Sequence, residues 1–234
     1  MSLIRVFSGK VPLYNSNPWV SSPLEAFIYT GGSRVSNLTT RKYDISSNLI
    51  WSVDHGQSVW AIAVDQFGNV YTGGARVSSL TTRKYDSSGT LLWSRDHGSN
   101  VFGITVDQFG NVYTGGDQIG NFTTRKYDSS GNLIWSTNHG AQVLGVEVDK
   151  YGNVYTGGSR FTISLTTRKY DSSGNLIWSV DHGARVNGIS VDKVGNVYTG
   201  GNRISNFTTR KYDSSGNLIW SLDHGGSVLS IKSQ

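Results

Sequence analysis

Short runs rich in Val, Tyr, Trp and Thr follow one another along this chain, and turn-forming residues separate them. Within residues 101–136 four such runs occur, which are Val101–Asp107, Val112–Gly116, Phe122–Asp128 and Leu133–Ser136. Alternation of faces, as in LIWSVD, predicts β-strands, and the Gly-Asn turns of DQFGN and DSSGN predict tight hairpins. No stretch longer than ten residues has the apolar spacing of a helix, so we predict an all-β chain.

The four runs recur as one unit. The Trp of the fourth run marks each copy, and the five copies lie at Trp51, Trp93, Trp135, Trp178 and Trp220, with a period of 42 or 43 residues. A period of this length is typical of one blade of a β-propeller. We therefore predict a single five-bladed β-propeller of four-stranded blades over residues 27–234.

The two ends of the repeat array suggest how the ring closes. After His224 the chain continues with Val228–Ser233, which matches a first strand that no second strand follows. The first copy has SSPLEA where its own first strand should end. We expect the C-terminal strand to join the N-terminal blade near Phe27, which would close the propeller and remove an exposed edge.

Residues 1–26 belong to no complete repeat, and all three prolines of the chain lie among them. We predict an N-terminal extended arm. It could cap its own ring or contact a neighbouring subunit, and Tyr14 and Trp19 are the candidate contact residues.

The words GITVDQFGNVYTGG and TTRKYDSSGNLIWS resemble the NHL and SBBP types of bacterial propeller repeat, and the resemblance covers residues 27–234. It implies a propeller. Propellers of this type serve as lyases, binding scaffolds, lectin-like modules and parts of phage particles, so the resemblance does not define one function. The copies here are nearly identical, whereas propeller enzymes diversify their blades to build one asymmetric site.

Composition narrows the function classes. The 234 residues include 29 Gly and 3 Pro, with 12% aromatic residues, which is typical of all-β domains with many turns. The absence of Cys excludes disulfides and Cys-based metal sites. The net charge is +5, but ten of the 21 basic residues belong to the five TTRKYD words, so the charge is weak support for a nucleic-acid partner.

No segment has the apolar length of a signal peptide core or of a membrane span. We expect a soluble chain without a signal peptide and without a membrane partner. The virion and the cytoplasm are the candidate locations.

Three repeated features, which are the Trp, the His and the Arg-Lys pair, each allow a structural and a functional interpretation. We expect the repeat Trp to pack between blades, with a sugar-stacking surface as the alternative. For the histidines we favour structural hydrogen bonds at the blade junction over acid–base or ligand roles. They follow each repeat Trp by four residues, as His55, His97, His139, His182 and His224.

The Arg-Lys pair of TTRKYD predicts a lattice of ion pairs between blades, with a polyanion-binding belt as the alternative. Each DxxGN or DSSGN turn offers one Asp and small polar residues. Such residues are typical of a tight turn and not of a calcium-binding loop, and we predict neither a metal nor a cofactor.

The connections between the second and third strands vary from copy to copy, and they share one face of the propeller with the segments after HG. On this face we predict a candidate binding site, although loops that merely tolerate change are an equal alternative. Its candidate residues are Arg34, Arg76, Gln118, Arg160, Arg203, the five histidines and Trp60. The next strand opens with Trp60, Phe102, Leu144, Asn187 and Leu229 at matching places.

These observations predict a non-catalytic, multivalent recognition or assembly module. A phage particle or a cell surface is the candidate setting, and a repetitive glycan or a protein lattice is the candidate partner. The alternative is a propeller lyase or hydrolase with a site at the central channel. That alternative requires a unique cluster of His, carboxylate and Arg, and Glu147 alone on a first strand does not provide one.

Overall fold

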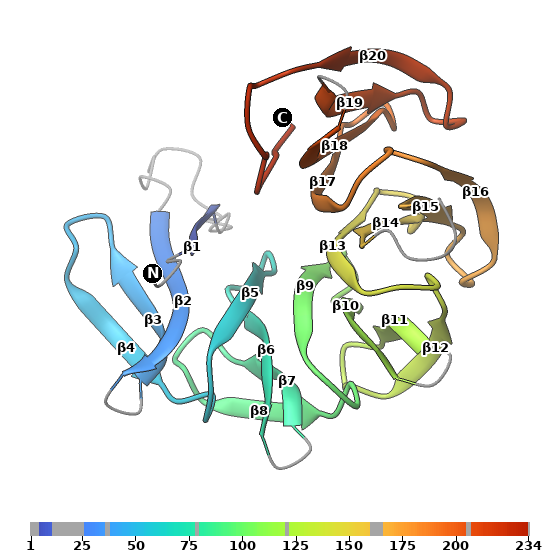
Figure 1. The fold of residues 1–234 in the computed structure, drawn as a ribbon. Coiled ribbons are helices and arrows are strands. Elements are labelled where there is room, and N and C mark those ends of the chain that lie inside the picture. Colours follow the sequence, from blue (N-terminus) through green and yellow to red (C-terminus); the bar gives the residue numbers. More distant parts are fainter. Residues whose placement is uncertain are drawn as a thin grey trace, which may run out of the picture.

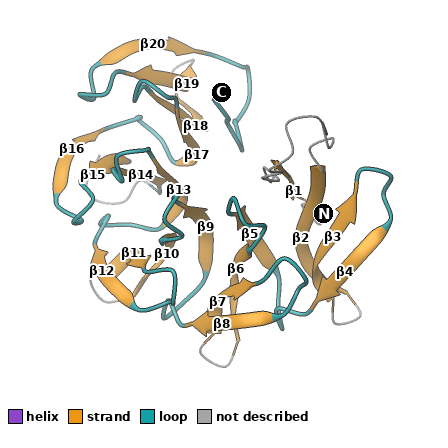
Figure 2. Cartoon of the chain, turned by 180° about the vertical axis from the view of Figure 1, so that it is seen from behind, coloured by secondary structure: helices purple, strands orange, loops and turns teal. Residues whose placement is uncertain are grey.

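The computed structural model describes residues 5–10, 26–35, 38–77, 80–119, 122–159, 166–204 and 207–233. Within these ranges every regular element is a strand, and the strands form five antiparallel four-stranded sheets in sequence order. Figure 1 shows the sheets side by side around a common centre, and Figure 2 shows the same arrangement from behind. Five four-stranded sheets confirm the all-β prediction and agree with a propeller-like repeat fold.

Each sheet runs from the centre outward. The first, innermost strands are β1 (Arg5–Lys10), β5 (Val59–Val64), β9 (Val101–Val106), β13 (Val143–Val148) and β17 (Val186–Val191). The second strands are β2 (Ala26–Val35), β6 (Val70–Val77), β10 (Val112–Ile119), β14 (Val154–Gly158) and β18 (Val197–Ile204). The third strands are β3 (Leu38–Asp44), β7 (Leu80–Tyr85), β11 (Phe122–Tyr127), β15 (Thr167–Tyr170) and β19 (Phe207–Tyr212). The outermost strands are β4 (Leu49–Val53), β8 (Leu91–Arg95), β12 (Leu133–Thr137), β16 (Leu176–Val180) and β20 (Leu218–Leu222).

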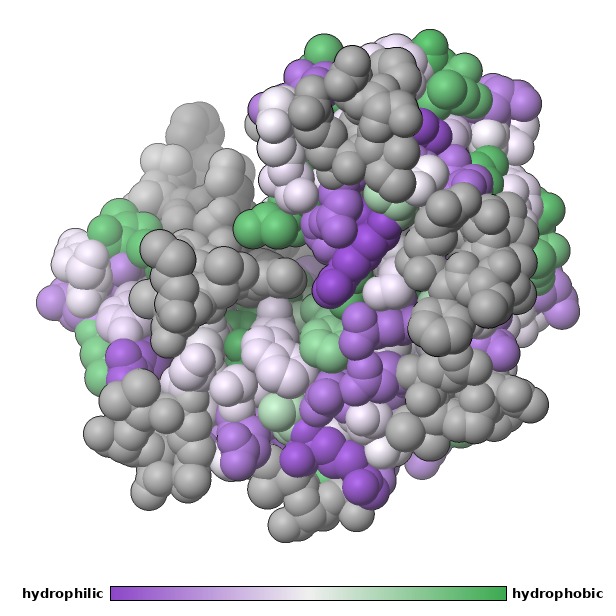
Figure 3. All heavy atoms as spheres, viewed as in Figure 1, coloured by the Kyte–Doolittle hydropathy of each residue, from purple (hydrophilic) through white to green (hydrophobic). Residues whose placement is uncertain are grey.

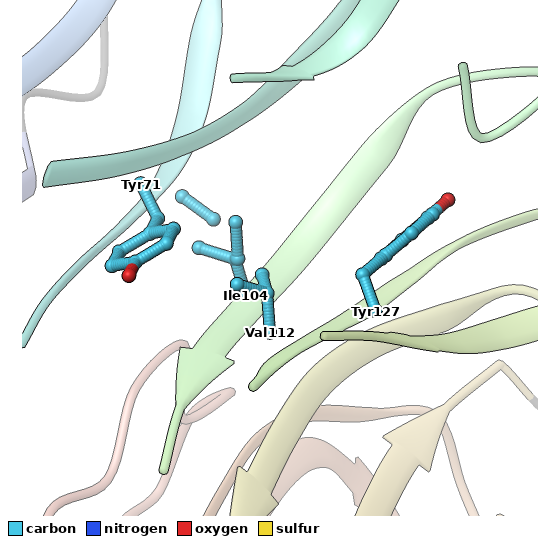
Figure 4. Packing of buried hydrophobic residues seen from close by; sticks show 5 residues of the cluster. Tyr71, Ile104, Val112 and Tyr127 are labelled. Carbon is cyan, nitrogen blue, oxygen red and sulfur yellow. The ribbon is translucent and has the colours of Figure 1, made fainter. Parts of the chain in front are cut away.

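The hydrophobic core lies between consecutive sheets. Tyr71 of the second sheet packs with Ile104, Val112 and Tyr127 of the third, and all four are buried. Figure 4 shows these side chains between the two sheets. Each sheet therefore buries its faces only against its neighbours, which is the physical reason for the repeated sequence.

The Gly-Gly pair at the end of each VYTGG word allows neighbouring sheets to approach closely. A Cβ placed on Gly157 of β14 would lie 2.5 Å from Cγ1 of Val186 in the next sheet. No side chain fits at that distance, so glycine is required where the innermost strand of the following sheet crosses.

The predicted closure of the ring is wrong. The innermost strand of the first sheet is β1, which pairs with β2 from Arg5 opposite Gly31 to Lys10 opposite Ala26. Part of the predicted arm therefore belongs to the first sheet, and residues 11–25 lie outside the described part. Because β1 takes the edge of β2, the C-terminal segment has no edge to join there.

The C-terminal segment, residues 226–233, forms no strand and lies against the fifth sheet instead. The backbone N–H of Val228 donates to the carbonyl of Gly201 at 2.9 Å. Val228 stands beside Gly200 as Val186 stands beside Gly157. The segment thus takes the place of the innermost strand of a following sheet, in the opening between the first and fifth sheets (Figure 1).

Candidate functional site

The repeated aspartates hold turns. Oδ1 of Asp107 accepts hydrogen bonds from the backbone N–H groups of Phe109 and Asn111, both at 2.9 Å, and Oδ2 accepts from the hydroxyl of Tyr113 at 3.0 Å. The carboxylate is thus occupied by its own turn, as predicted. In the part of the chain that the structure describes, no three His, Cys, Asp or Glu side chains cluster in a way that could hold a metal ion.

Four of the five histidines are buried and join adjacent sheets. Nδ1 of His97 lies 3.0 Å from the hydroxyl of Thr114, and its backbone N–H donates to the hydroxyl of Thr81 at 2.8 Å. Burial, together with the charge of Arg125, lowers the pKa of His97 to about 4. His55, His139 and His182 repeat this arrangement, whereas His224 of the last copy is exposed. The buried four have no surface for a ligand, which supports the structural interpretation.

At the boundaries between consecutive sheets, the Trp, Lys and Arg of the repeat donate to backbone carbonyls of the neighbouring sheet. Nε1 of Trp93 and Nζ of Lys84 both donate to the carbonyl of Ser129 in the next sheet, at 3.1 Å. Nη1 of Arg83 donates to the carbonyl of Asp54 in the preceding sheet at 2.9 Å. For this Arg-Lys pair the acceptors are therefore carbonyls and not the carboxylates that we expected. A carbonyl satisfies a buried cation without the desolvation of a second charge.

The predicted arginine belt is described only in part. Arg76 is exposed, and its guanidinium pairs with Asp96 of the same sheet at 3.0 Å. The other predicted belt and arm side chains lie outside the described part, and these are Arg34, Gln118, Arg160, Arg203, Tyr14 and Trp19. Their part in a site stays a prediction.

A pocket of about 300 Å³ lies at the mouth of the central channel. Its wall contains the matching first-strand residues of the second to fifth copies and of the C-terminal segment, namely Trp60, Phe102, Leu144, Asn187 and Leu229. The rings of Trp60 and Phe102 stack at 5.0 Å between centroids and 17° between planes. Figure 3, which shows this face, has apolar atoms near its centre with hydrophilic atoms beside them.

Polar groups border this mouth pocket on one side. The side-chain amide of Asn187 donates to the carbonyl of Val228 at 3.0 Å, which fixes the C-terminal segment at the rim. Arg185 also lines the pocket, is exposed, and has no ion pair with any described residue. Among the described lining residues, the mouth therefore combines an apolar floor with one accessible cation, Arg185.

The channel below the mouth holds about 460 Å³ and contains one carboxylate, Glu147, among its described lining residues. Nζ of Lys232 lies 3.4 Å from Oε1 of Glu147. Burial raises the pKa of Glu147, and the charge of Lys232 opposes this shift. Glu147 is half-buried, and Glu147 and Lys232 are the two ionisable side chains of the described lining.

Of the predicted site residues whose side chains the structure describes, only Trp60 lies in the mouth pocket. Phe102, Leu144, Asn187 and Leu229 were not among the predicted ligand-binding residues, although the sequence held a signal for them. They occupy one of the two positions of the first strand at which the side chain changes most between copies, and the other is that of Ala63, Thr105, Glu147, Ser190 and Lys232.

Comparison with known proteins supports the architecture. No family model and no curated protein matches the chain. Among solved structures, a chain of the "Crystal Structure of Mitotic Checkpoint Complex" aligns with a TM-score of 0.74 and 18% identity over 88% of this chain. This chain spans 66% of the length of that one.

The protein is thus an all-β repeat protein of the β-propeller class. The narrower resemblance to NHL and SBBP repeats has no support from a family model. In the described ranges no helix has the length and apolarity needed to cross a membrane.

Proposed function

We propose that this protein is a non-catalytic recognition module that binds a partner protein at the mouth pocket. One observation carries the proposal. The repeated Trp, Lys and Arg side chains donate to backbone carbonyls between consecutive sheets, and a first-strand position that varies between copies lines one pocket at the centre of one face. Variation at a pocket on a rigid scaffold is typical of a recognition site.

The chemistry of the mouth favours a peptide segment as the ligand. Stacked aromatic rings beside Leu144 form an apolar floor that suits one aromatic or aliphatic side chain. Arg185 at the rim suits a carboxylate next to that side chain. Buried aromatic residues together with an arginine are the usual hot spots of protein interfaces.

Two further points bear on the class of partner. The solved structure named above is, by its title, that of a complex, which supports a role in protein assembly. The five matching positions line one shared pocket, and this favours one partner segment over five separate glycan sites. A repetitive glycan, a protein lattice and a phage or cell-surface setting stay as predictions.

The test is selection of a random-peptide display library on the purified protein. We expect enriched peptides with an apolar anchor next to an acidic residue. Their affinity should fall at least about tenfold in Trp60→Ser and in Arg185→Glu, because each change removes one of the two contacts.

The matched control is Tyr151→Ser, because Tyr151 is also an exposed aromatic but lies in a turn on the opposite face. If peptides bind the parent and both mouth variants equally, the proposed site is wrong. Binding of the parent to a glycan array, unchanged in Trp60→Ser, would favour the glycan prediction instead.

A further inference from the structure

Each internal boundary between sheets uses the same pair of donors. The Lys of TTRKYD and the repeat Trp of one sheet both donate to one backbone carbonyl in a turn of the next sheet, at 3.0–3.2 Å. These pairs and their acceptors are Lys42 and Trp51 with Ser87, Lys84 and Trp93 with Ser129, Lys126 and Trp135 with Ser172, and Lys169 and Trp178 with Ser214.

The fifth sheet presents the same donors without an acceptor. Lys211 lies over the ring of Tyr198, and neither its Nζ nor Nε1 of Trp220 reaches a carbonyl of any described residue. Trp220 is 40% exposed, and Leu222 beside it is 51% exposed. The ring of His224 is exposed, although its four equivalents are buried. This surface, formed by Lys211, Trp220, Leu222 and His224, is named the trailing face.

The first sheet presents the opposite half of the boundary. Tyr43 and Thr30 are only half-buried, whereas the equivalent tyrosines and threonines of the other four sheets are buried. The side chain of Arg41 makes no hydrogen bond with a described residue, whereas the side chain of Arg83 at the same position donates to the carbonyl of Asp54 in the preceding sheet. This surface, formed by Thr30, Arg41, Tyr43 and the turn 44–48, is named the leading face.

The two faces are complementary because they are the two halves of a boundary that the chain already makes four times. We propose that the trailing face of one copy binds the leading face of a second copy. In this contact Trp220 and Lys211 donate to the carbonyl of Ile45, which stands where Ser87 stands in the next repeat. Such a head-to-tail contact leaves one free face at each end, so association continues beyond a dimer.

The position of the C-terminal segment favours a second copy over the first sheet of the same chain. The segment lies between the two end sheets, and the structure keeps those sheets apart (Figure 2). Val228 and Ile231 already occupy the place of an innermost strand, beside Gly200 and Gly188. The incoming first sheet therefore takes this segment in place of its own β1.

The sequence of β1 suits this exchange. By its pairing with Gly31, Arg5 occupies the register position of Gly103 and Gly145 in later sheets and of Ser230 in the C-terminal segment. A Cβ on Gly103 would already lie 3.0 Å from the backbone nitrogen of Val146. A small residue is therefore required at this position, and Ser230 meets the requirement better than Arg5.

One residue weakens the contact. In the internal boundaries the Trp packs against a turn glycine, and a Cβ on Gly174 would lie 2.9 Å from Cδ2 of Trp135. The leading face has Ser47 at this turn position, with φ of 67°. Its Cβ requires the indole of Trp220 to shift, so the contact between copies is weaker than an internal boundary.

Sedimentation velocity of the full chain over a wide concentration range tests the proposal. We expect species larger than a dimer to grow with concentration, and Trp220→Ala to raise the concentration needed at least about tenfold. Ser47→Gly should lower it by about tenfold, because it removes the crowding Cβ. Tyr151→Ala, which removes an exposed aromatic away from both faces, should leave it unchanged.

Quenching of indole fluorescence by acrylamide separates the remaining outcomes. A parent that stays monomeric while Trp220 is protected, compared with Trp220→Phe, would show that the trailing face covers its own first sheet, and this overturns the proposal. A monomer with an accessible Trp220 at every concentration also overturns it, as does an increase in association that Ser47→Gly and Trp220→Ala leave unchanged. A negative result in these association experiments would not contradict the proposed binding at the mouth pocket, because peptide binding there requires neither the trailing face nor the leading face.

Discussion

The four buried histidines should make the protein sensitive to mild acid. The pKa of His97 falls from 6.5 to about 4 on folding, because burial and the charge of Arg125 disfavour the imidazolium. The unfolded chain therefore binds more protons between these two values. The free energy of unfolding is fully present above pH 6.5 and falls as the pH decreases toward 4, by about 3 kcal/mol for this histidine.

Replacement of one buried histidine tests the magnitude. His97→Asn retains a polar group that can face the hydroxyl of Thr114 but cannot titrate. Urea unfolding between pH 7 and pH 4.5 should show a slope of stability against pH that is lower than the parent slope by about 1.4 kcal/mol per pH unit. Stability at pH 7 should also fall by about 1 kcal/mol from imperfect packing, and this loss does not depend on pH.

The last repeat provides the matched control. His224→Asn removes a histidine whose ring is exposed, so the slope should stay that of the parent. His139→Asn provides a second buried site, where burial and Arg168 lower the pKa to about 3. An unchanged slope in both buried-site variants, or equal changes in the exposed and buried variants, would refute burial as the origin of the acid sensitivity.

Three further changes test the boundaries between sheets and the channel. Gly174→Ala should lower the free energy of unfolding by about 2 kcal/mol in urea, because φ is +88° and the Cβ would meet the ring of Trp135. Trp135→Phe should cost about 1 kcal/mol in the same assay, because it removes the hydrogen bond to the carbonyl of Ser172 at 3.0 Å. Glu147→Gln should change thermal stability by less than about 0.5 kcal/mol, because its partner Lys232 is 77% exposed, and a larger loss would show that the pair anchors the C-terminal segment.

The strands could be predicted from the sequence because turn-forming residues mark the ends of each strand. The expected strand 101–107 is β9 at Val101–Val106, and the expected strand 133–136 is β12 at Leu133–Thr137. Gly110 lies in the turn after β9, and Gly131 lies in the turn before β12. Their φ angles are 80° and 82°, a conformation that few other residues adopt. Turn chemistry of this kind depends on four or five consecutive residues, so one sequence suffices to predict it.

Closure could not be predicted in the same way. Residues 5–10 pair with β2, although the local pattern of residues 228–233 is the better match to an innermost strand. Which segment pairs depends on how far apart the ends of the array lie, and this distance depends on the angle between sheets at every boundary. No local sequence signal specifies the sum of these angles between sheets.

Only part of the mouth pocket could be predicted from the sequence. Phe102 and Leu144 are each the second residue of an innermost strand that also holds buried core residues, such as Ile104 and Val146, so an apolar side chain there predicts a core residue rather than a binding-site residue. The structure places these positions around one channel, and residues separated by a whole repeat become neighbours, such as Trp60 and Phe102. Variation between copies at this position is the signal that favours a binding site over the core.

The near-identity of the repeats stabilises the contacts between consecutive sheets, but it also leaves complementary surfaces exposed on the first and fifth sheets. A boundary built from the same Lys, Trp and turn carbonyl cannot distinguish the next sheet of its own chain from the first sheet of another copy. Two residues of the first turn break that equivalence. Ile45 and Ser47 replace the Ser and Gly of the later turns, and Ser47 places a side chain against the indole that would arrive. The first turn therefore limits end-to-end association, as charged or bulged edges limit it in other β proteins.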